Sequence, residues 1–386
     1  MTDFFRLNRL AGLIATATIL SVATPAWSGG DFNPPPPIEP EPPKEQKTFG
    51  FSGELTVEFQ NDNNIDSNDP DAELSDVYNT TELALEMTVN EFLSGHASLT
   101  FEPVLDPGPG EDRFFEDEGL YAEELYAKVT LGGGISVLGG KFNPLFGKAW
   151  DVTPGVYGTD FAEDYEVTEQ LGFGVSLERD AGSLGKAIVT GSIYNADTSG
   201  LSGSIITDRG RTRVSDGGAG NTEDLDSYSV ALDLEEMPAL GGASLNFGYR
   251  FHNQGKTVDD LDDENGYVAG IYGSRQLNGV EFQYVGEVVY LDSAEGTLDN
   301  LWYYTVGGAV VFSGKYNVAV SYTGRPRDVA GGGDFEDKQL QVSAGVELRN
   351  GWALDGAYKY HVEENVDNHT IGVLLAKTFE FDTRNR

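Results

Sequence analysis

The stretch Gln339–His361, QLQVSAGVELRNGWALDGAYKYH, alternates apolar and polar residues on both sides of a short break at Arg349–Asn350. Alternation at every second residue is the pattern of a β-strand, whose successive side chains point to opposite faces. A break this short is typical of a tight turn between antiparallel strands. The stretch therefore predicts a β-hairpin with one apolar and one polar face.

The same alternation recurs along most of the chain. We expect about sixteen strands, near residues 50–60, 78–89, 95–102, 120–131, 135–142, 167–178, 186–195, 226–235, 243–252, 266–275, 279–290, 300–312, 315–324, 337–348, 351–361 and 368–379. Most are close to the ~9–11 residues that cross a bilayer when tilted, and an even strand number is the rule for bacterial outer-membrane barrels. The sequence predicts an all-β fold, a transmembrane antiparallel β-barrel.

The connections between these strands alternate in length. Short ones are expected at 90–94, 132–134, 180–185, 236–242, 276–278, 313–314 and 349–350, and long ones at 61–77, 103–119, 143–166, 196–225, 253–265, 291–299, 325–336 and 362–367. Transmembrane barrels have short turns at one end and long loops at the other. The strand pattern alone also fits a soluble sandwich, whose apolar face would be its core. The loop sorting favours the barrel, with Leu83, Leu85, Val342 and Val346 facing lipid.

The N-terminal segment has the pattern of an export signal. Arg6 and Arg9 precede the apolar run Leu10–Val22, and small residues follow before Gly29. This organisation predicts a signal peptide over residues 1–28, too short to be a membrane-spanning helix.

The remaining boundaries follow from composition. Residues 29–48 are rich in proline, which predicts an extended leader on the periplasmic side. This leader could contact a periplasmic partner, or it could be disordered without a partner. The barrel is expected over residues 49–381, followed by a C-terminal extension, 382–386.

Composition excludes several kinds of function. The formal net charge of −38 is unfavourable for binding nucleic acid, and the chain has no cysteine for disulfides or thiolate chemistry. Asn368-His369-Thr370 lacks the companions of a hydrolase triad, and the acidic run Asp259–Glu264 lacks the ligand spacing of an EF-hand. We expect no catalytic residues, no metal site and no cofactor.

One basic segment stands out in this acidic chain. Arg209-Gly210-Arg211-Thr212-Arg213 lies in the long connection 196–225. Its arginines could meet the phosphates of lipopolysaccharide, or they could form a solvated patch.

One connection is long, aromatic and rich in glycine and proline. Residues 140–166 read GKFNPLFGKAWDVTPGVYGTDFAEDYE and lie between the fifth and sixth expected strands. Loops of this length in compact domains usually carry function. We expect it to fold into the lumen as a constriction loop, with an external lid as the alternative. The candidate constriction residues are Asn143, Pro144, Phe146, Gly147, Asp151, Asp160, Glu163, Asp164 and Glu166.

Strand parity places many charged side chains on the polar face, which in a membrane barrel is the lumen. They are Glu54, Glu58, Glu82, Glu86, Glu124, Glu281, Glu287, Glu347, Asp355, Lys128, Arg250, Arg325 and Lys359. Acids outnumber bases, which predicts a mild preference for cations. Lys128 and Arg250 are the candidate bases opposing the loop acids.

These features resemble the Gram-negative sixteen-stranded porins over about residues 49–381. Asn143-Pro144-Leu145-Phe146-Gly147 is similar to the Pro-x-Phe-Gly segment of the porin constriction loop, and the wider run to Glu166 is similar to a subgroup of siderophore porins. The last strand, with Phe379 and Phe381, resembles the C-terminal signal of the barrel-assembly machinery, although Lys377 interrupts its apolar face and five residues follow it.

The resemblance implies a barrel in contact with outer-membrane lipid and lipopolysaccharide, and it is compatible with a homotrimer. The sequence thus predicts an outer-membrane porin for passive diffusion of small hydrophilic solutes and ions, without catalysis. Two alternatives stay open at this stage. One is a substrate-selective channel, such as one for iron–siderophore complexes, and the other is a barrel enzyme or structural outer-membrane protein.

Overall fold

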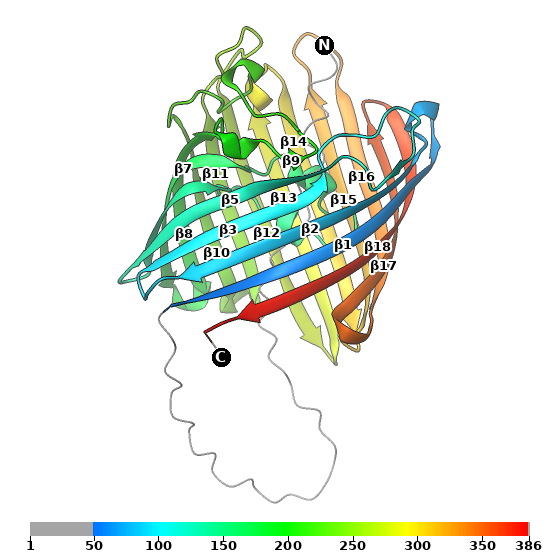
Figure 1. The fold of residues 1–386 in the computed structure, drawn as a ribbon. Helices are drawn as coiled ribbons and strands as arrows, with labels where there is room; N and C mark the ends of the chain where they lie inside the picture. The colour runs from blue at the N-terminus through cyan, green and yellow to red at the C-terminus, as the bar shows by residue number, and fades with distance from the viewer. Residues whose placement is uncertain (1–48, 385–386) are drawn as a thin grey trace, which may run out of the picture.

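Residues 49–384, the part of the chain that the computed structural model describes, form one antiparallel sheet that closes on itself (Figure 1). Each wall strand pairs with the next along the chain, and the last pairs with the first. The wall strands are β1 (Gly50–Ser67), β2 (Ser75–Thr88), β3 (Leu93–Pro103), β5 (Glu118–Leu131), β6 (Ile135–Phe142), β7 (Gln170–Asp180), β8 (Lys186–Ala196), β10 (Ser227–Met237), β11 (Ala243–His252), β12 (Glu264–Leu277), β13 (Val280–Asp292), β14 (Asn300–Phe312), β15 (Tyr316–Asp328), β16 (Phe335–Glu347), β17 (Trp352–Glu363) and β18 (Val366–Asp382). The prediction of a closed sixteen-stranded barrel is confirmed.

The remaining elements are short. Two-residue strands β4 (Arg113–Phe114) and β9 (Ile205–Ile206) add to the edges of β2 and β5. The helical elements are α1 (Ala149–Val152) and α2 (Asp160–Glu163), with the 3-10 turns η2 (Pro70–Ala72), η3 (Gly182–Leu184), η4 (Gly200–Ser202), η5 (Val214–Asp216), η6 (Pro238–Leu240), η7 (Ala294–Gly296) and η8 (Arg349–Gly351). Within residues 49–384, no helix has the length and apolar character needed to cross a membrane. The predicted signal peptide, residues 1–28, and the whole predicted leader, residues 29–48, lie outside the described residues.

The hairpin 339–361 shows which face of the wall is apolar. Gln341 pairs with Lys359, and its side chain is fully buried inside the barrel. Its neighbour Val342 pairs with Tyr358, and both are exposed on the outer surface. The apolar face is therefore outside and the polar face inside, the reverse of a soluble sandwich. The outward parity includes Leu83, Leu85, Val342 and Val346, as expected.

Because Val342 faces outward in the middle of β16, a charged residue at this position is expected to destabilise the barrel. Val342→Arg should cost about 2–4 kcal/mol of folding free energy in lipid, since a cation on the lipid face near the bilayer midplane has that effect. Leu85 is a poorer site because it lies close to Thr88, where β2 ends. Denaturant titrations in liposomes measure the loss, with Thr190→Arg, at a half-buried lumen-facing position in the middle of β8, as the comparison. A water-exposed label at position 342 would contradict the facing.

Long connections gather at the upper end of the barrel in Figure 1 and short turns at the lower end, as the sequence predicts. Three expected connections are too long. The one expected at 325–336 is 329–334, because β15 continues to Asp328 and β16 begins at Phe335. Residues 61–77 are not one acidic loop, because β1 continues to Ser67 and β2 begins at Ser75, with Asn61–Asn63 paired to Ser75–Val77. Cross-strand pairing outweighs the low strand propensity of asparagine and aspartate there. The connection expected at 362–367 is a tight turn at Glu364–Asn365, both with positive φ.

Candidate functional site: an acid-lined passage beside an inner loop

The connection between β6 and β7, residues 143–169, bends into the barrel and packs on its inner wall; we call it the inner loop. Its side chains and backbone contact residues on β1, β11, β13, β15, β16 and β17, as the following contacts show. A loop outside the barrel could not reach this set of inward-facing residues. The inner loop therefore occupies the lumen, as predicted, rather than forming an external lid.

Glu287, an inward-facing residue of β13, holds the first part of the inner loop. Its carboxylate accepts hydrogen bonds from the backbone N–H of Lys148 (2.8 Å) and of Ala149 (3.0 Å), and from the Tyr165 hydroxyl (2.6 Å). The N–H groups at the start of a helix have no partner within it, so an acceptor placed there satisfies them. Glu287 thus ties both ends of the loop's folded part to one wall strand.

Aromatic packing supports the same region. Phe146 is fully buried, and the guanidinium of Arg250 lies over its ring at 4.7 Å. Arg250 also donates to the Tyr165 carbonyl (2.6 Å) and to Glu264 (2.8 Å). Gly147 has φ +78, and a side chain there would collide with the Tyr165 ring. The arginine expected to oppose the loop acids instead anchors the loop backbone.

The tip of the inner loop reaches across to β16 and β1. The amide of Gln341 donates to the Pro154 carbonyl at 3.0 Å, and that of Gln339 donates to the Tyr157 carbonyl. The Tyr157 hydroxyl then donates to Asp62 of β1 at 2.5 Å. Contacts with β16 and with β1 therefore hold the tip of the loop against the inner wall.

Two acids at the ends of α2, Asp160 and the C-cap residue Asp164, are paired with bases of the wall. Lys359 of β17 contacts Asp160 at 2.7 Å, and Arg325 of β15 contacts Asp164 at 2.6 Å. Arg325 also contacts Asp337 (2.8 Å) and Glu363 (2.6 Å). Both bases were placed in the lumen by strand parity, but the sequence could not show which loop acid each one meets.

Other loop acids have no such base beside them. Burial raises the pKa of the Glu163 carboxyl well above its ordinary value, and the neighbouring Asp160 carboxylate adds to the rise. Burial likewise raises the pKa of Glu166, with further contributions from the carboxylates of Glu123, Asp151, Glu124 and Glu82 in that order. The hydrogen bonds of Asn143 to Glu124 and Glu123 place the base of the loop beside this acidic stretch of wall.

We call this stretch the acidic wall: Glu82 of β2, Glu102 of β3, and Glu123 and Glu124 of β5. Both consecutive residues of β5 face inward because a bulge shifts the register between Ser98 and Leu99. Alternation predicted only Glu124, so Glu123 was missed. A bulge leaves no mark in a sequence that a parity count can detect.

A cavity lies between the inner loop and the wall, against residues of β1, β2 and β3 and of β15, β16 and β17; we call it the passage. It is lined by, among others, Asp62, Tyr78, Glu102, Asp160, Glu163 and Lys359. Carboxylates dominate this lining, and the bases in it contact acids directly. Acidic side chains outnumber basic ones in this lining, a balance that favours cations over anions.

The other predicted residues lie at the edges of this arrangement. Asn143 bridges the loop to the acidic wall, donating its backbone N–H to Glu124 (3.0 Å) and its amide to Glu123 (2.9 Å). Glu86 and Glu124 flank the His96 ring at 2.9 and 3.2 Å. Lys128 is exposed near the lower end of β5, away from the loop acids. Pro144 is buried at the point where the chain turns inward, and Asp151 lies in α1.

Several anchoring residues did not stand out in the sequence. Asp62, Gln339 and Gln341 hold the tip of the loop. Gln339 and Gln341 look like ordinary polar residues of a strand, and their inward direction could be predicted but not their height relative to the loop. Asp62 was expected in the connection 61–77, so its inward direction was not predicted. No group of three or more His, Cys, Asp or Glu residues in the range 49–384 is arranged to hold a metal ion.

Solved structures with this architecture are outer-membrane channels. OprB of Pseudomonas putida has a TM-score of 0.60 at 11% identity, covering 86% of this chain and 94% of that one. OmpF of Salmonella typhi, solved with daunomycin, has a TM-score of 0.58 at 12% identity (85% and 97%). The channel DcaP of Acinetobacter baumannii has a TM-score of 0.53 at 12% identity (86% and 96%).

The chain has the porin fold. At these identities the likeness concerns architecture alone. No protein-family model matches the chain, and a search of curated proteins found no relative. The residues of this chain are therefore the basis for inferring which solutes pass through the barrel.

Proposed function

We propose that this chain is an outer-membrane porin, a water-filled channel through which small hydrophilic solutes and ions diffuse passively. The observation that carries the proposal is the inner loop. It is anchored to the wall by hydrogen bonds and ion pairs, and it leaves a passage lined by charged side chains. A structural barrel has no need for such a lining, whereas a diffusion channel uses it to select by charge.

The outer surface supports a location in the outer membrane. Exposed apolar and aromatic side chains cover the strands, including Val373 and Phe381 of the last strand, β18. Tyrosines and a tryptophan stack in a row across neighbouring strands, from Tyr249 through Tyr267 and Tyr290 to Trp302. Such aromatic belts lie at the interface between lipid and water. We therefore propose outer-membrane lipid, lipopolysaccharide and the barrel-assembly machinery, which would recognise β18, as partners of this chain.

The charge of the passage predicts a measurable selectivity. In planar bilayers under a salt gradient, the purified protein should conduct as an open channel, and its reversal potential should show a mild cation preference at neutral pH. Protein refolded in detergent and shown to be heat-modifiable is the starting material. Absence of conductance would contradict the porin proposal, and clear anion selectivity would contradict the assignment of the acidic wall. Saturable block by an iron–siderophore complex would indicate a substrate-selective channel instead.

A further inference from the structure

The wall of the barrel is incomplete beside the point where the inner loop leaves it. β6 ends at Phe142, and its pairing with β5 reaches only to Leu125. The upper part of β5 therefore has no wall strand on that side. The gap is filled by the connection between β8 and β10, residues 197–226, which we call the strap. Its strand β9 pairs with Gly119 and Leu120 of β5, so the strap crosses over β6 and β7 to reach it.

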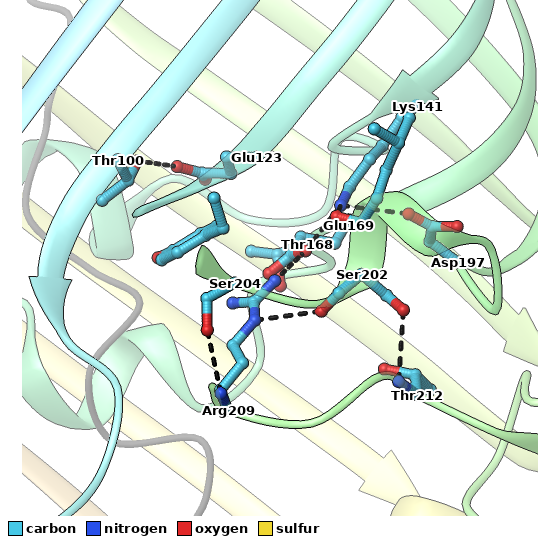
Figure 2. Close-up of polar contacts among 12 residues, drawn as sticks. Thr100, Glu123, Lys141, Thr168, Glu169, Asp197, Ser202, Ser204, Arg209 and Thr212 are labelled. Carbon is cyan, nitrogen blue, oxygen red and sulfur yellow. Dashed lines mark hydrogen bonds and ion pairs between the residues drawn. The ribbon is translucent and has the colours of Figure 1, made fainter. Parts of the chain in front are cut away.

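The inner loop has a neck at the same place. Its first residue, Asn143, accepts a hydrogen bond from the backbone N–H of its last, Glu169, at 2.8 Å. Glu169 has φ +55, a backbone conformation that is unfavourable for a residue other than glycine. Lys141, fully buried at the end of β6, contacts the Glu169 carboxylate at 2.7 Å and Asp197 of the strap at 3.1 Å. Neck and strap therefore share one buried ion-pair network (Figure 2).

Arg209 of the strap completes this network. It contacts the Glu169 carboxylate at 2.5 Å, donates to the Ser202 carbonyl at 3.0 Å, and lies over the Tyr121 ring at 3.8 Å. Figure 2 shows Arg209 reaching from the strap towards Glu169, with Lys141 approaching from the opposite side. Arg211, two residues along the same basic segment, is exposed and bonds only within the strap, to the Thr198 carbonyl. The two arginines thus have different surroundings, although they look alike in the sequence.

We propose that Arg209 is a positioning residue that locks the neck of the inner loop and so holds the passage steadily open. Without it, Glu169 and Asp197 share the single cation of Lys141, and Glu169 loses the guanidinium that holds it in its strained conformation. The acidic wall lies next to this neck, since Asn143 bonds Glu123 and Glu124. The neck is then held by Lys141 and by the Asn143–Glu169 hydrogen bond alone, and larger excursions of the loop base in the lumen interrupt conduction.

This inference rests on the proposed channel function and is tested by single-channel recording. Arg209→Gln should raise the frequency of brief closures about tenfold, the factor expected from the loss of one hydrogen bond between charged groups. Arg211→Gln, which removes the same charge from the same loop, should leave the closures unchanged. Arg209→Lys should be intermediate, because lysine reaches Glu169 but cannot also bond Ser202 and cover Tyr121.

A crosslink separates loss of the Arg209–Glu169 contact from detachment of the strap. The chain has no native cysteine, so Leu120→Cys with Ile205→Cys, directly opposite in the β5–β9 pair, is chemically clean. Added to Arg209→Gln, the oxidised pair holds the strap on β5 but leaves Glu169 without its guanidinium, so the closures should persist. Closures in Arg209→Gln equal to the native level, or quiet conduction restored by the crosslink, would overturn the inference.

Two remaining outcomes are also decisive. If Arg209→Gln fails to insert, Arg209→Lys with and without the crosslink carries the same comparison, and native-like closures there would overturn the proposal. If the native protein does not conduct at all, the proposed channel function is contradicted. If the native protein conducts and its Arg209 variants behave like it, the channel function stands and only the role of Arg209 is contradicted.

Discussion

Replacing residues 145–162 by a short Gly-Ser bridge should raise the single-channel conductance about two- to threefold, because this segment packs inside the lumen and its removal should widen the path for ions. The replacement removes the contacts of Phe146 and Ala149 on the wall and the tip that Gln341 and Asp62 hold. It keeps the neck, Asn143 and Glu169, and with it the closure of the wall by the strap. Conductance in planar bilayers measures the change.

The matched control shortens a loop outside the lumen. Residues 329–334, between β15 and β16, form an exposed connection that bonds the neighbouring outer loop through Asp299. Shortening it should leave conductance nearly unchanged. Residues 61–77 are unsuitable for this purpose, because they belong largely to β1 and β2 and include the anchor Asp62. Equal conductance in the native and loop-shortened proteins, both heat-modifiable, would show that the inner loop does not limit the pore.

The facing and number of the strands could be predicted because both depend on local pattern. Alternation at every second residue is a direct consequence of strand geometry. In the hairpin 339–361, Gln341 is buried inside the barrel and its neighbour Val342 is exposed on the outside, as this alternation requires. Strand ends are less predictable. Asn61–Asn63 continue β1 because β2 and β18 pair with them, and that partnership lies far away in the sequence.

The location of the inner loop could be predicted, but its contacts could not. Its length, glycines and aromatic residues mark it as an ordered insertion, and the buried Phe146 confirms that these residues pack. Which strand meets Asp160 or Asp164 depends on strand height, tilt and closure of the barrel. These are properties of the whole wall, so no local pattern reports that Lys359 and Arg325 are the partners.

The basic segment 209–213 illustrates the same limit. Its arginines were equivalent in the sequence, and a surface contact with phosphates was a reasonable expectation for all of them. The structure turns Arg209 inward onto Glu169 while Arg211 stays exposed. The difference arises from the pairing of β9 with β5, a contact between segments on opposite sides of β6 and β7.

Neutralising the three acids of α2 and its C-terminal end together, with Asp160→Asn, Glu163→Gln and Asp164→Asn, should remove most of the cation preference while conduction persists. Glu163 contributes little of this effect, because burial raises the pKa of its carboxyl well above the ordinary value. Asp160 and Asp164 are the carboxylates that contact Lys359 and Arg325, so their loss leaves these two bases uncompensated beside the passage. Arg325 keeps Asp337 and Glu363 as partners, which leaves Lys359 as the main new positive charge.

The control removes equal charge elsewhere, through Glu111→Gln, Asp259→Asn and Asp334→Asn on exposed outer loops. Charges there are separated from the passage by solvent and screened over a Debye length of ~10 Å at 0.1 M salt, so the reversal potential should barely move. Lys359→Met should shift the reversal potential in the opposite direction. It leaves Asp160 unpaired and should strengthen the cation preference. An unchanged reversal potential in the triple α2 variant would place the selective charges outside the inner loop, on the acidic wall alone.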